Sequence, residues 1–593
     1  MLEPAGSCCR ARYCSSWDPA FDELKPMPRT YSSSRTPWCS THITEDHEEE
    51  TESLYDEEND STLAEVEEEC LRNFCSRVGA FAPWDEETII PKFVREERLP
   101  LSPQDDSRQV ALLDEYDDSG SSIWLSTALE ASELAKNLGG NGRSNVEEAA
   151  IRRIYIPNLT PVIVRCLARA ATPLECRVLP DFMEQHLEGT PVIEARILPD
   201  GYKTFCFEFH LPHLILRTDR IVRKDYRRLS GRPLRHEFQI PCLDKGNDML
   251  GSFDIIYQAV TSCLIVGSFS KRWTGYMLTD SYFVNPDKTF GEDCIEYWTE
   301  ERADHAKPDP FTLGRSLSDC SFTNARDYFI NTFSTRVERI MGEWRNLVTH
   351  LTTALDHQSP LLSHKKDVVS LREESHIPRD PDDSVALRDE GIWLDRAMGL
   401  VQVCHRSLGE TVVELERFLP TAISMFCDGE GRGAPGDRPQ IRHDRVASIT
   451  RTTQQLSRLH TRLESLRDTL AFRSECVRKE LTSRLVEEAA AQTHFQSSLV
   501  NANKQAGLIS VVCIPIVMVS ILLSITESAL PLNPSPQTAL IVFLVFQIVI
   551  SSLWFASSSR RLVALVQKWI GDIGKSFVRD KVHEKKPRAE PYL

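Results

Sequence analysis

The chain has 593 residues, 17 cysteines and a formal net charge of −18. This length predicts two or three folded units joined by linkers, and no nucleic-acid partner is expected of so acidic a chain. The sequence contains no nucleophile–base motif, P-loop or paired-cysteine metal signature, so neither an enzyme nor a cofactor is expected.

The first 105 residues are predicted to be disordered. Between Glu45 and Glu69 the chain carries fourteen acidic residues and no Lys or Arg, in EDHEEETESLYDEENDSTLAEVEEE. Such a run repels itself and buries little apolar surface. The region 1–105 is therefore expected to be an acidic, disordered N-terminal segment.

A mixed cytosolic domain, α+β or α/β in class, is predicted at 106–310. Short β-rich runs alternate there with helical stretches such as TPVIVRCLARAA. In TFCFEFH, Phe205, Phe207 and Phe209 alternate with other residues, which is the period-two pattern of a half-buried strand.

Two polar features of this domain are candidates for a site. The motif HLPH places His210 and His213 at the end of a strand, and without a neighbouring Cys or carboxylate cluster we interpret both as structural. A basic stretch follows, with Arg217, Arg220, Arg223, Lys224, Arg227, Arg228, Arg232 and Arg235. An anionic lipid surface or the acidic run would neutralise it, and a solvated loop is an equally good interpretation.

Long helices are predicted next: a helix at 311–355, a flexible linker at 356–385 and a helical stalk at 386–504. The first is indicated by apolar residues three and four apart: Phe329, Phe333, Val337, Ile340, Trp344, Leu347 and Leu351. The stalk carries a coiled-coil-like seam of residues seven apart: Ile449, Leu456, Leu463, Leu470 and Val477. This last helix is expected to continue into a membrane span.

A hairpin of two transmembrane helices is predicted at 505–557. The runs Ala506–Ile525 and Thr538–Phe555 are uncharged, and each is close to the ~20 residues that cross a bilayer. Basic residues precede the first run and fill a basic cytoplasmic tail at 558–593, whereas the connecting loop has none. By the positive-inside rule, both termini of this multi-pass protein face the cytoplasm or a matrix.

One face of the first span differs from the rest. Helical spacing brings five residues onto it: Ser510, Cys513, Val517, Ser520 and Ser524. Hydroxyl-bearing and small residues on one stripe either line a water-filled pore or let helices pack closely. The sequence leaves both interpretations open.

The order of these parts resembles the CorA-like magnesium and divalent-cation transporters, which assemble as pentamers around the first span. The resemblance implies a homo-oligomer in a lipid bilayer, with the Ser510–Ser524 face along its axis and Mg²⁺ or another divalent cation as the transported substrate. Three stretches within Arg152–Leu351 are also similar to filamentous-fungal membrane proteins of no assigned activity. These are FCFEFHLPHLILR, RWTGYMLTDSYF and ARDYFINTFSTRVERIMGEWRNLV.

The outer end of the first span departs from the CorA-like pattern. Those transporters carry Gly-Met-Asn there, whereas this chain reads SITESALPLNP. Glu527 is the only carboxylate of the loop and Asn533 is its nearest amide, so these two are the candidate cation ligands. A ring of Glu527 carboxylates in an oligomer favours cations. The alternative is a non-conducting, membrane-anchored scaffold or interaction protein.

Overall fold

The structure is a computed structural model in which two compact units are described separately, Met1–Cys476 and Val477–Leu593. The residues that it describes are 21, 68–75, 89–96, 109–117, 120–125, 129–138, 149–172, 174–198, 204–239, 253–283, 309–316, 324–373, 382–427, 439–524, 537, 540–545, 547–552 and 555.

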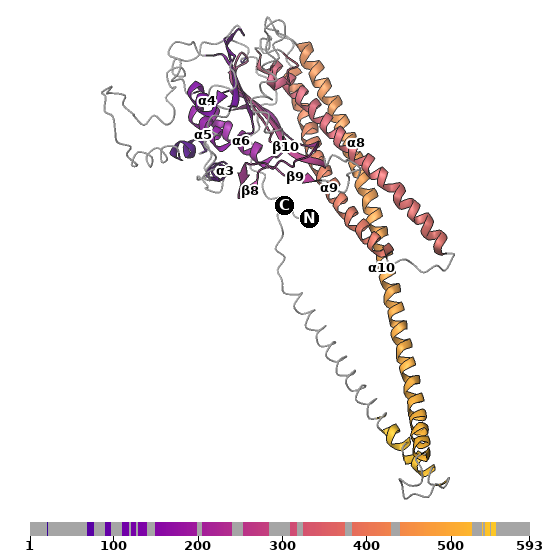
Figure 1. The fold of residues 1–593 in the computed structure, drawn as a ribbon. Helices are drawn as coiled ribbons and strands as arrows, with labels where there is room; N and C mark the ends of the chain where they lie inside the picture. Colours follow the sequence, from indigo (N-terminus) through magenta and orange to yellow (C-terminus); the bar gives the residue numbers. More distant parts are fainter. Residues whose placement is uncertain are drawn as a thin grey trace, which may run out of the picture. The chain divides into compact units, whose positions relative to one another are not determined.

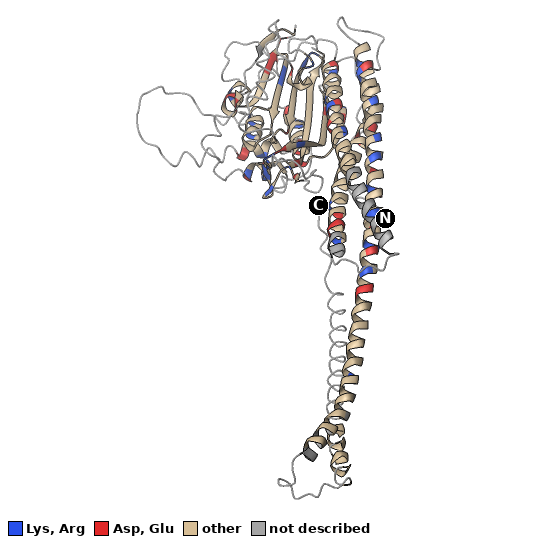
Figure 2. Ribbon diagram, turned by 45° about the vertical axis from the view of Figure 1, so that its right-hand side comes forward, with Lys and Arg blue, Asp and Glu red and all other residues tan. Residues whose placement is uncertain are grey.

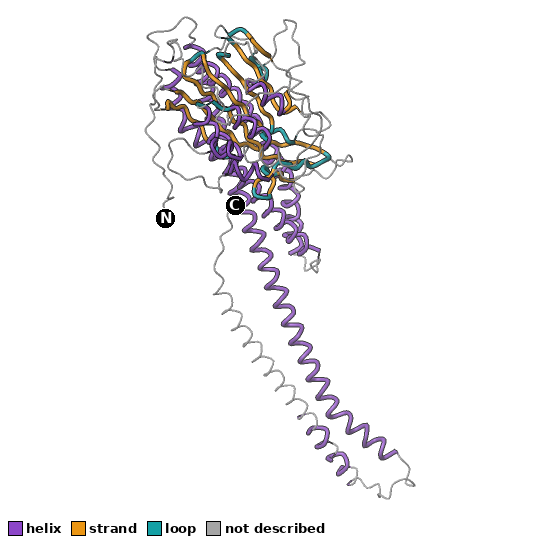
Figure 3. The backbone as a smooth tube through the Cα atoms, turned by 90° about the vertical axis from the view of Figure 1, so that its left-hand side faces the viewer, coloured by secondary structure: helices purple, strands orange, loops and turns teal. Residues whose placement is uncertain are grey.

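The first unit is built around a nine-stranded sheet (Figure 1, Figure 3). Its strands are β1 (Gln109–Tyr116), β2 (Ser122–Leu125), β3 (Leu129–Glu130), β4 (Ile151–Pro157), β5 (Val192–Leu198), β6 (Thr204–Asp219), β9 (Glu237–Gln239), β10 (Phe253–Phe269) and β11 (Arg272–Thr279). Their order is β2-β1-β4-β11-β10-β6-β5, with β3 beside β1 and β9 beside β10. Only the β11–β4 pair is parallel among the described pairs. The predicted mixed domain followed by long helices is confirmed.

The strands β6 and β10 are the longest of the sheet and pair along nearly their whole length. The alternating pattern in TFCFEFH correctly predicts a strand, but the expectation of a half-buried one is wrong. All six residues from Phe205 to His210 are buried, with exposures of 0%. Helices cover both faces of the sheet here, so the side chains that alternate with the phenylalanines are excluded from water as well (Figure 1).

One face of the sheet is covered by α3 (Ile89–Arg95), α4 (Ala131–Leu138), α5 (Pro161–Ala170) and α6 (Leu179–Glu188). Thr160 caps the start of α5 by accepting a hydrogen bond from the Ile163 N–H, and Pro161 fits its first turn. Gly189, with φ of 70°, ends α6 in the left-handed conformation. These caps fix where α5 begins and where α6 ends.

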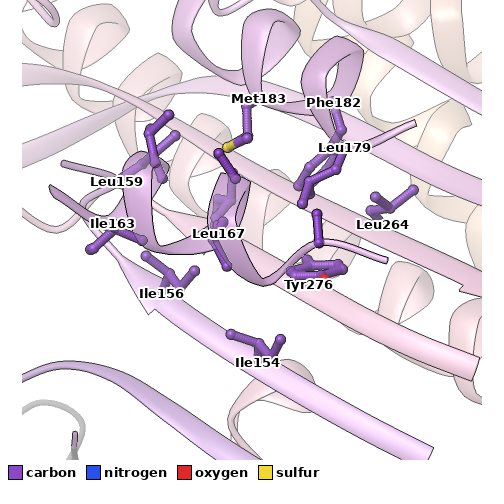
Figure 4. Packing of buried hydrophobic residues seen from close by; sticks show 14 of the residues in the cluster. Ile154, Ile156, Leu159, Ile163, Leu167, Leu179, Phe182, Met183, Leu264 and Tyr276 are labelled. Carbon is purple, nitrogen blue, oxygen red and sulfur yellow. The ribbon is translucent and has the colours of Figure 1, made fainter. Parts of the chain in front are cut away.

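The core on this face joins residues far apart in the chain (Figure 4). Ile154 and Ile156 of β4 pack with Leu167 of α5 and Phe182 of α6. The helix α3 and residues 68–75 belong to the same core, and Phe93 is fully buried. Parts of the region 1–105, predicted to be disordered, are therefore ordered in the structure.

The opposite face of the sheet is covered by long helices. These are α8 (Ala325–Glu373), α9 (Asp382–Ala422) and α10 (Pro439–Ser524), with a π-helical turn at Ile423–Cys427 after α9. The ring centroids of Phe207 and Phe329 lie 5.3 Å apart, and those of Phe209 and Phe333 lie 5.1 Å apart. The helix α8 continues past residue 355 into the stretch where the sequence predicts a linker.

The predicted seam of α10 is buried within the chain. Ile449, Leu456, Leu463 and Leu470 are at most 1% exposed. Contacts of α10 with α8 connect Ser448 to Glu338 and Gln455 to Arg345, so those helices run parallel. Contacts with α9 connect Ser474 to Asp395 and stack His460 on His405, so those two run antiparallel. Three helices of one chain thus fill the seam.

In the second unit, α10 continues from Val477 to Ser524, and most of its described side chains after Val477 are exposed. Val477 is the last buried side chain of the helix among the described residues. Leu485, Phe495 and Leu499 are 65%, 64% and 48% exposed. Charged residues become sparse toward the C-terminal end of this helix (Figure 2).

Candidate functional site

The predicted pore face lies on α10. Ser510, Cys513, Val517 and Ser520 are exposed on this helix, and Ser524 is its last residue, with a side chain outside the described set. The Ser520 hydroxyl donates a 2.8 Å hydrogen bond to the Ile516 carbonyl, so its donor is satisfied within the helix. The helix brings these residues onto one stripe, as the spacing predicts.

The candidate cation ligands Glu527 and Asn533 lie outside the described residues, as does most of the connecting loop. Among the residues that the structure describes, no group of three or more His, Cys, Asp or Glu side chains is placed to hold a metal ion. Within that same part of the chain, none of the helices has the combination of length and hydropathy of a membrane span. The hairpin at 505–557 and its ligands therefore stay predictions.

A buried ionic cluster lies at the end of β11, where the sequence predicts no site. Asp280 follows β11, and its carboxylate accepts hydrogen bonds from the Val260 N–H at 2.8 Å and from Arg235 Nε at 2.6 Å. Arg227 Nη2 lies 2.8 Å from the other oxygen of Asp280 and also pairs with Asp225. Burial raises the pKa of Asp280, but the two guanidinium groups outweigh it and hold that pKa well below its usual value.

Arg235 connects this cluster to a helix end. Its guanidinium donates to the carbonyls of Leu187 at 2.8 Å and His186 at 2.5 Å, in the last turn of α6. Carbonyls at a helix C-terminus have no partner within the helix and attract cations. Arg235 therefore satisfies three acceptors at once and holds α6 against the sheet.

A chain of side-chain contacts leads from Asp280 across the sheet face. Asp280 lies 3.6 Å from Nε2 of His186, and His186 Nδ1 lies 2.9 Å from the Ser262 hydroxyl. His210 Nδ1 lies 2.8 Å from the same hydroxyl. Asp280 favours a proton on Nε2 of His186, so Nδ1 of that ring accepts from Ser262, and Ser262 accepts from Nδ1–H of His210. This assignment follows from the hydrogen-bond network.

Burial favours the neutral form of both histidines of this contact chain, His186 and His210. Burial lowers the pKa of His186 below 6.5, although Asp280 opposes the shift. Burial also lowers the pKa of His210 well below 6.5, and the neighbouring His186 and Arg196 reinforce this. An imidazolium is therefore disfavoured both at His186, beside Arg227 and Arg235, and at His210, beside Arg196.

The order Asp280–His186–Ser262 is that of an acid, a base and a nucleophile, but the setting is not that of a reactive site. Ser262 and His186 are 0% exposed, so a substrate has no access to the hydroxyl. Asp280 is already paired with two arginines. We interpret the cluster as a polar connection between α6, β10 and β11, as the sequence suggests for His210 itself.

The predicted basic stretch from Arg217 to His236 divides into two parts. Arg227 and Arg235 are buried in the cluster above, and Arg223 pairs with Asp219 at 3.1 Å. The others are more exposed. Sequence reasoning treated the stretch as one unit because Asp280, the carboxylate that Arg227 and Arg235 share, lies outside it.

Comparisons with known proteins give matches among solved structures alone. No protein-family model matches the chain, and no curated protein does. The CorA magnesium transporter from Methanocaldococcus jannaschii matches with 10% identity and a TM-score of 0.28, over 75% of this chain and 96% of that one. The full-length CmaX protein matches with 9% identity and a TM-score of 0.28, over 77% and 98%. Neither match assigns a role to a residue of this chain.

Proposed function

We propose that this chain is an integral membrane protein that conducts a divalent cation, with Mg²⁺ as the first ion to test. The observation that carries the proposal is the continuity of α10. One helix begins in the bundle at Pro439 and runs to Ser524, within the uncharged run that starts at Ala506. A continuous helix couples the packed bundle to the predicted span without a loop.

The exposed surface at the end of α10 supports a lipid environment. Ile509, Ile514 and Ile521 are 61%, 49% and 52% exposed. A contiguous apolar surface of this kind marks contact with a membrane or with another protein. The uncharged run is also as long as a bilayer crossing requires.

The outer loop supplies the candidate ion site. One Glu527 carboxylate from each subunit forms a ring of negative charge in a homo-oligomer, and Asn533 adds an amide oxygen. Such rings concentrate cations at a pore mouth. A divalent cation that keeps several waters suits this sparse ligand set.

A non-conducting scaffold is the second candidate, and two observations favour it. The loop reads SITESALPLNP in place of Gly-Met-Asn. The seam of α10 up to Leu470 is already filled by α8 and α9, so it is not available to other copies of the chain. In this alternative the hairpin anchors the sheet domain to a membrane and carries no ion.

A Mg²⁺ flux assay separates the two candidates, and the native Cys513 provides a site at which a reagent can block the pore. The full chain in liposomes loaded with a magnesium-sensitive dye is expected to take up Mg²⁺, and Glu527→Ala is expected to weaken the uptake. A positively charged thiol reagent is expected to block it through Cys513, whereas Cys513→Ser retains flux and resists the reagent. Ser520→Trp tests the stripe, and Leu522→Trp, on the opposite side by helical spacing, is its matched control.

Absence of flux from a folded, inserted oligomer leaves the scaffold as the function. If the thiol reagent inhibits the wild type and Cys513→Ser equally, the stripe does not line the ion pathway. Crosslinking in native membranes is the cheaper first step, because a monomer is incompatible with an axial pore. Release of the protein by carbonate extraction contradicts both candidates.

A further inference from the structure

We propose that an exposed basic surface on the sheet domain binds the acidic run Glu45–Glu69 of the same chain. The surface, here called the basic loop surface, consists of the exposed side chains of Arg220, Lys224, Arg228 and Arg232. The first two follow β6, and the others belong to the small hairpin of β7 (Arg228–Leu229) and β8 (Arg232–Pro233).

The basic loop surface lacks a neutralising partner in the described part of the chain. Arg220, Lys224 and Arg232 form no ion pair with any described residue. Arg228 donates only to the Gly231 carbonyl, at 3.3 Å. In contrast, Arg227 and Arg235 of the same stretch are paired with buried acids. The paired arginines stabilise the fold, whereas the exposed ones form no ion pair with a described residue.

Apolar side chains interrupt this charge. Ile221 is 66% exposed and Tyr226 is 50% exposed, between the basic residues. The acidic run itself contains Leu54, Tyr55 and Leu63 among its carboxylates. Alternating charge and apolar groups on both sides suit a binding surface better than a purely solvated loop.

The folded core holds the end of the acidic run beside this surface. Glu68, within the run, forms a 3.4 Å ion pair with Arg95 at the end of α3. The next residue, Glu96, accepts hydrogen bonds from the Gly231 N–H at 3.0 and 3.1 Å. Gly231 is in the turn between β7 and β8, and Figure 1 shows β8 near α3. Two consecutive residues thus connect the run to the basic hairpin.

The hairpin turn itself is suited to present charge. Ser230 and Gly231 have φ angles of 55° and 74°, as in a tight two-residue turn. Open space surrounds the position where a Cβ on Gly231 would lie. Arg228 and Arg232 flank this turn, and both side chains are exposed. Figure 2 shows Lys and Arg gathered at this end of the sheet domain.

Tethering favours this occupant over a separate partner. The run carries fourteen acidic residues, and its last ones are already attached to the core through Arg95. A ligand held by a short tether has an effective concentration of roughly millimolar, so weak charge pairs suffice for binding. Anionic lipid is the competing occupant, and it has no such tether to this surface.

Zero-length carbodiimide crosslinking of the full chain tests the proposal. Lys224 is the one amine of the surface, and we expect it to couple to carboxylates between Glu45 and Glu67, mapped by mass spectrometry. Lys224→Arg keeps the charge but has no amine, and should lose this crosslink. The yield should fall several-fold between about 0.05 M and about 1 M NaCl, because the Debye length shrinks to roughly 3 Å.

Limited trypsin digestion gives an independent readout. Replacing Asp56, Glu57 and Glu58 by their amides should speed cleavage after Arg220, Lys224 and Arg228 several-fold, whereas cleavage at the buried Arg235 should not change. A mixture of isotopically heavy and light chains should give crosslinks within one chain.

Three outcomes overturn the proposal. The first is absence of a crosslink between Lys224 and the run at low salt, with unchanged trypsin cleavage in the amide variant. The second is a crosslink formed between heavy and light chains, which assigns the surface to a second copy. The third is protection of Lys224 in nanodiscs that contain phosphatidylserine but not in phosphatidylcholine alone, which assigns it to lipid.

Discussion

The two parts of α10 have similar apolar residues but opposite surroundings. Leu456 and Leu463, before Cys476, are 0% exposed, whereas Leu485 and Phe495, after it, are 65% and 64% exposed. The difference lies in the neighbours, because α8 and α9 cover the first part and no described residue covers the second. Apolar spacing thus predicts that a helix has a buried face, and it does not identify the partner.

The two units also differ in their charged residues. In the first unit, Asp280, Arg227 and Arg235 compensate one another away from water. In the second unit, α10 becomes uncharged after Lys504. The first unit satisfies its buried charges within one chain, whereas most of the described apolar side chains of α10 after Val477 are exposed.

Asp280→Asn is expected to have the largest effect. It leaves two buried guanidinium groups without their shared carboxylate, and breaking a buried pair in this way costs about 3–5 kcal/mol. The free energy of unfolding of the detergent-solubilised full chain, followed by near-UV circular dichroism in urea, measures the loss. Asp219→Asn is the matched control, since its pair with Arg223 is partly exposed and is worth roughly 1 kcal/mol or less. Equal losses in both variants would contradict the structural role of the cluster.

Leu456→Ala and Leu485→Ala compare the two parts of α10 directly. The first opens a cavity in the three-helix seam and is expected to lower the free energy of unfolding by about 2–5 kcal/mol. The second removes an exposed side chain and is expected to change it by about 0.5 kcal/mol or less in a monomer. A large effect of Leu485→Ala would show that another copy of the chain covers that residue, and would sharpen the case for an oligomer.

Acid is expected to destabilise the first unit through its buried histidines. The pKa values of His186 and His210 are lowered in the folded state, so below pH 6.5 the unfolded chain binds more protons than the folded chain. The stabilisation is therefore fully present above pH 6.5, the ordinary histidine pKa, and it is lost as the pH falls below that value. The loss is at most about 1.4 kcal/mol per histidine for each pH unit.

Thermal unfolding at roughly pH 7.5 and 5.5, on either side of the ordinary histidine pKa, measures this effect. His210→Asn is expected to reduce the dependence on pH. His236→Asn replaces an exposed ring and should leave it unchanged. A Tm that does not change between the two pH values would contradict the neutral assignment of both rings.

Local pattern was enough for the elements that depend on near neighbours. The alternation in TFCFEFH predicts β6, the spacing from Phe329 to Leu351 predicts the buried face of α8, and the heptads predict the seam of α10. Burial of the second face of β6 was not predictable from the residues of the strand. It depends on α6, a separate helix that packs against that face of the sheet. Disorder was overpredicted at α3, whose short apolar stretch is ordered only by the core it joins.

The candidate sites divide in the same way. The stripe from Ser510 to Ser524 follows from helical spacing alone, and its pore role stays a prediction. In the buried ionic cluster, Asp280 and His186 are 94 positions apart in the sequence, and no local pattern connects them. The basic stretch was visible in the sequence, but which of its arginines are free to bind a partner was not.

The order of charged and apolar residues along the chain indicates the strands, the helical faces, the acidic run and the uncharged C-terminal runs. Periodicity and charge density are properties of neighbouring residues, so they can be read without the fold. The fold is needed to know which faces are covered, which arginines are neutralised and how far α10 is packed by its own chain. Those outcomes depend on contacts between distant segments, which form only when the sheet and the long helices come together.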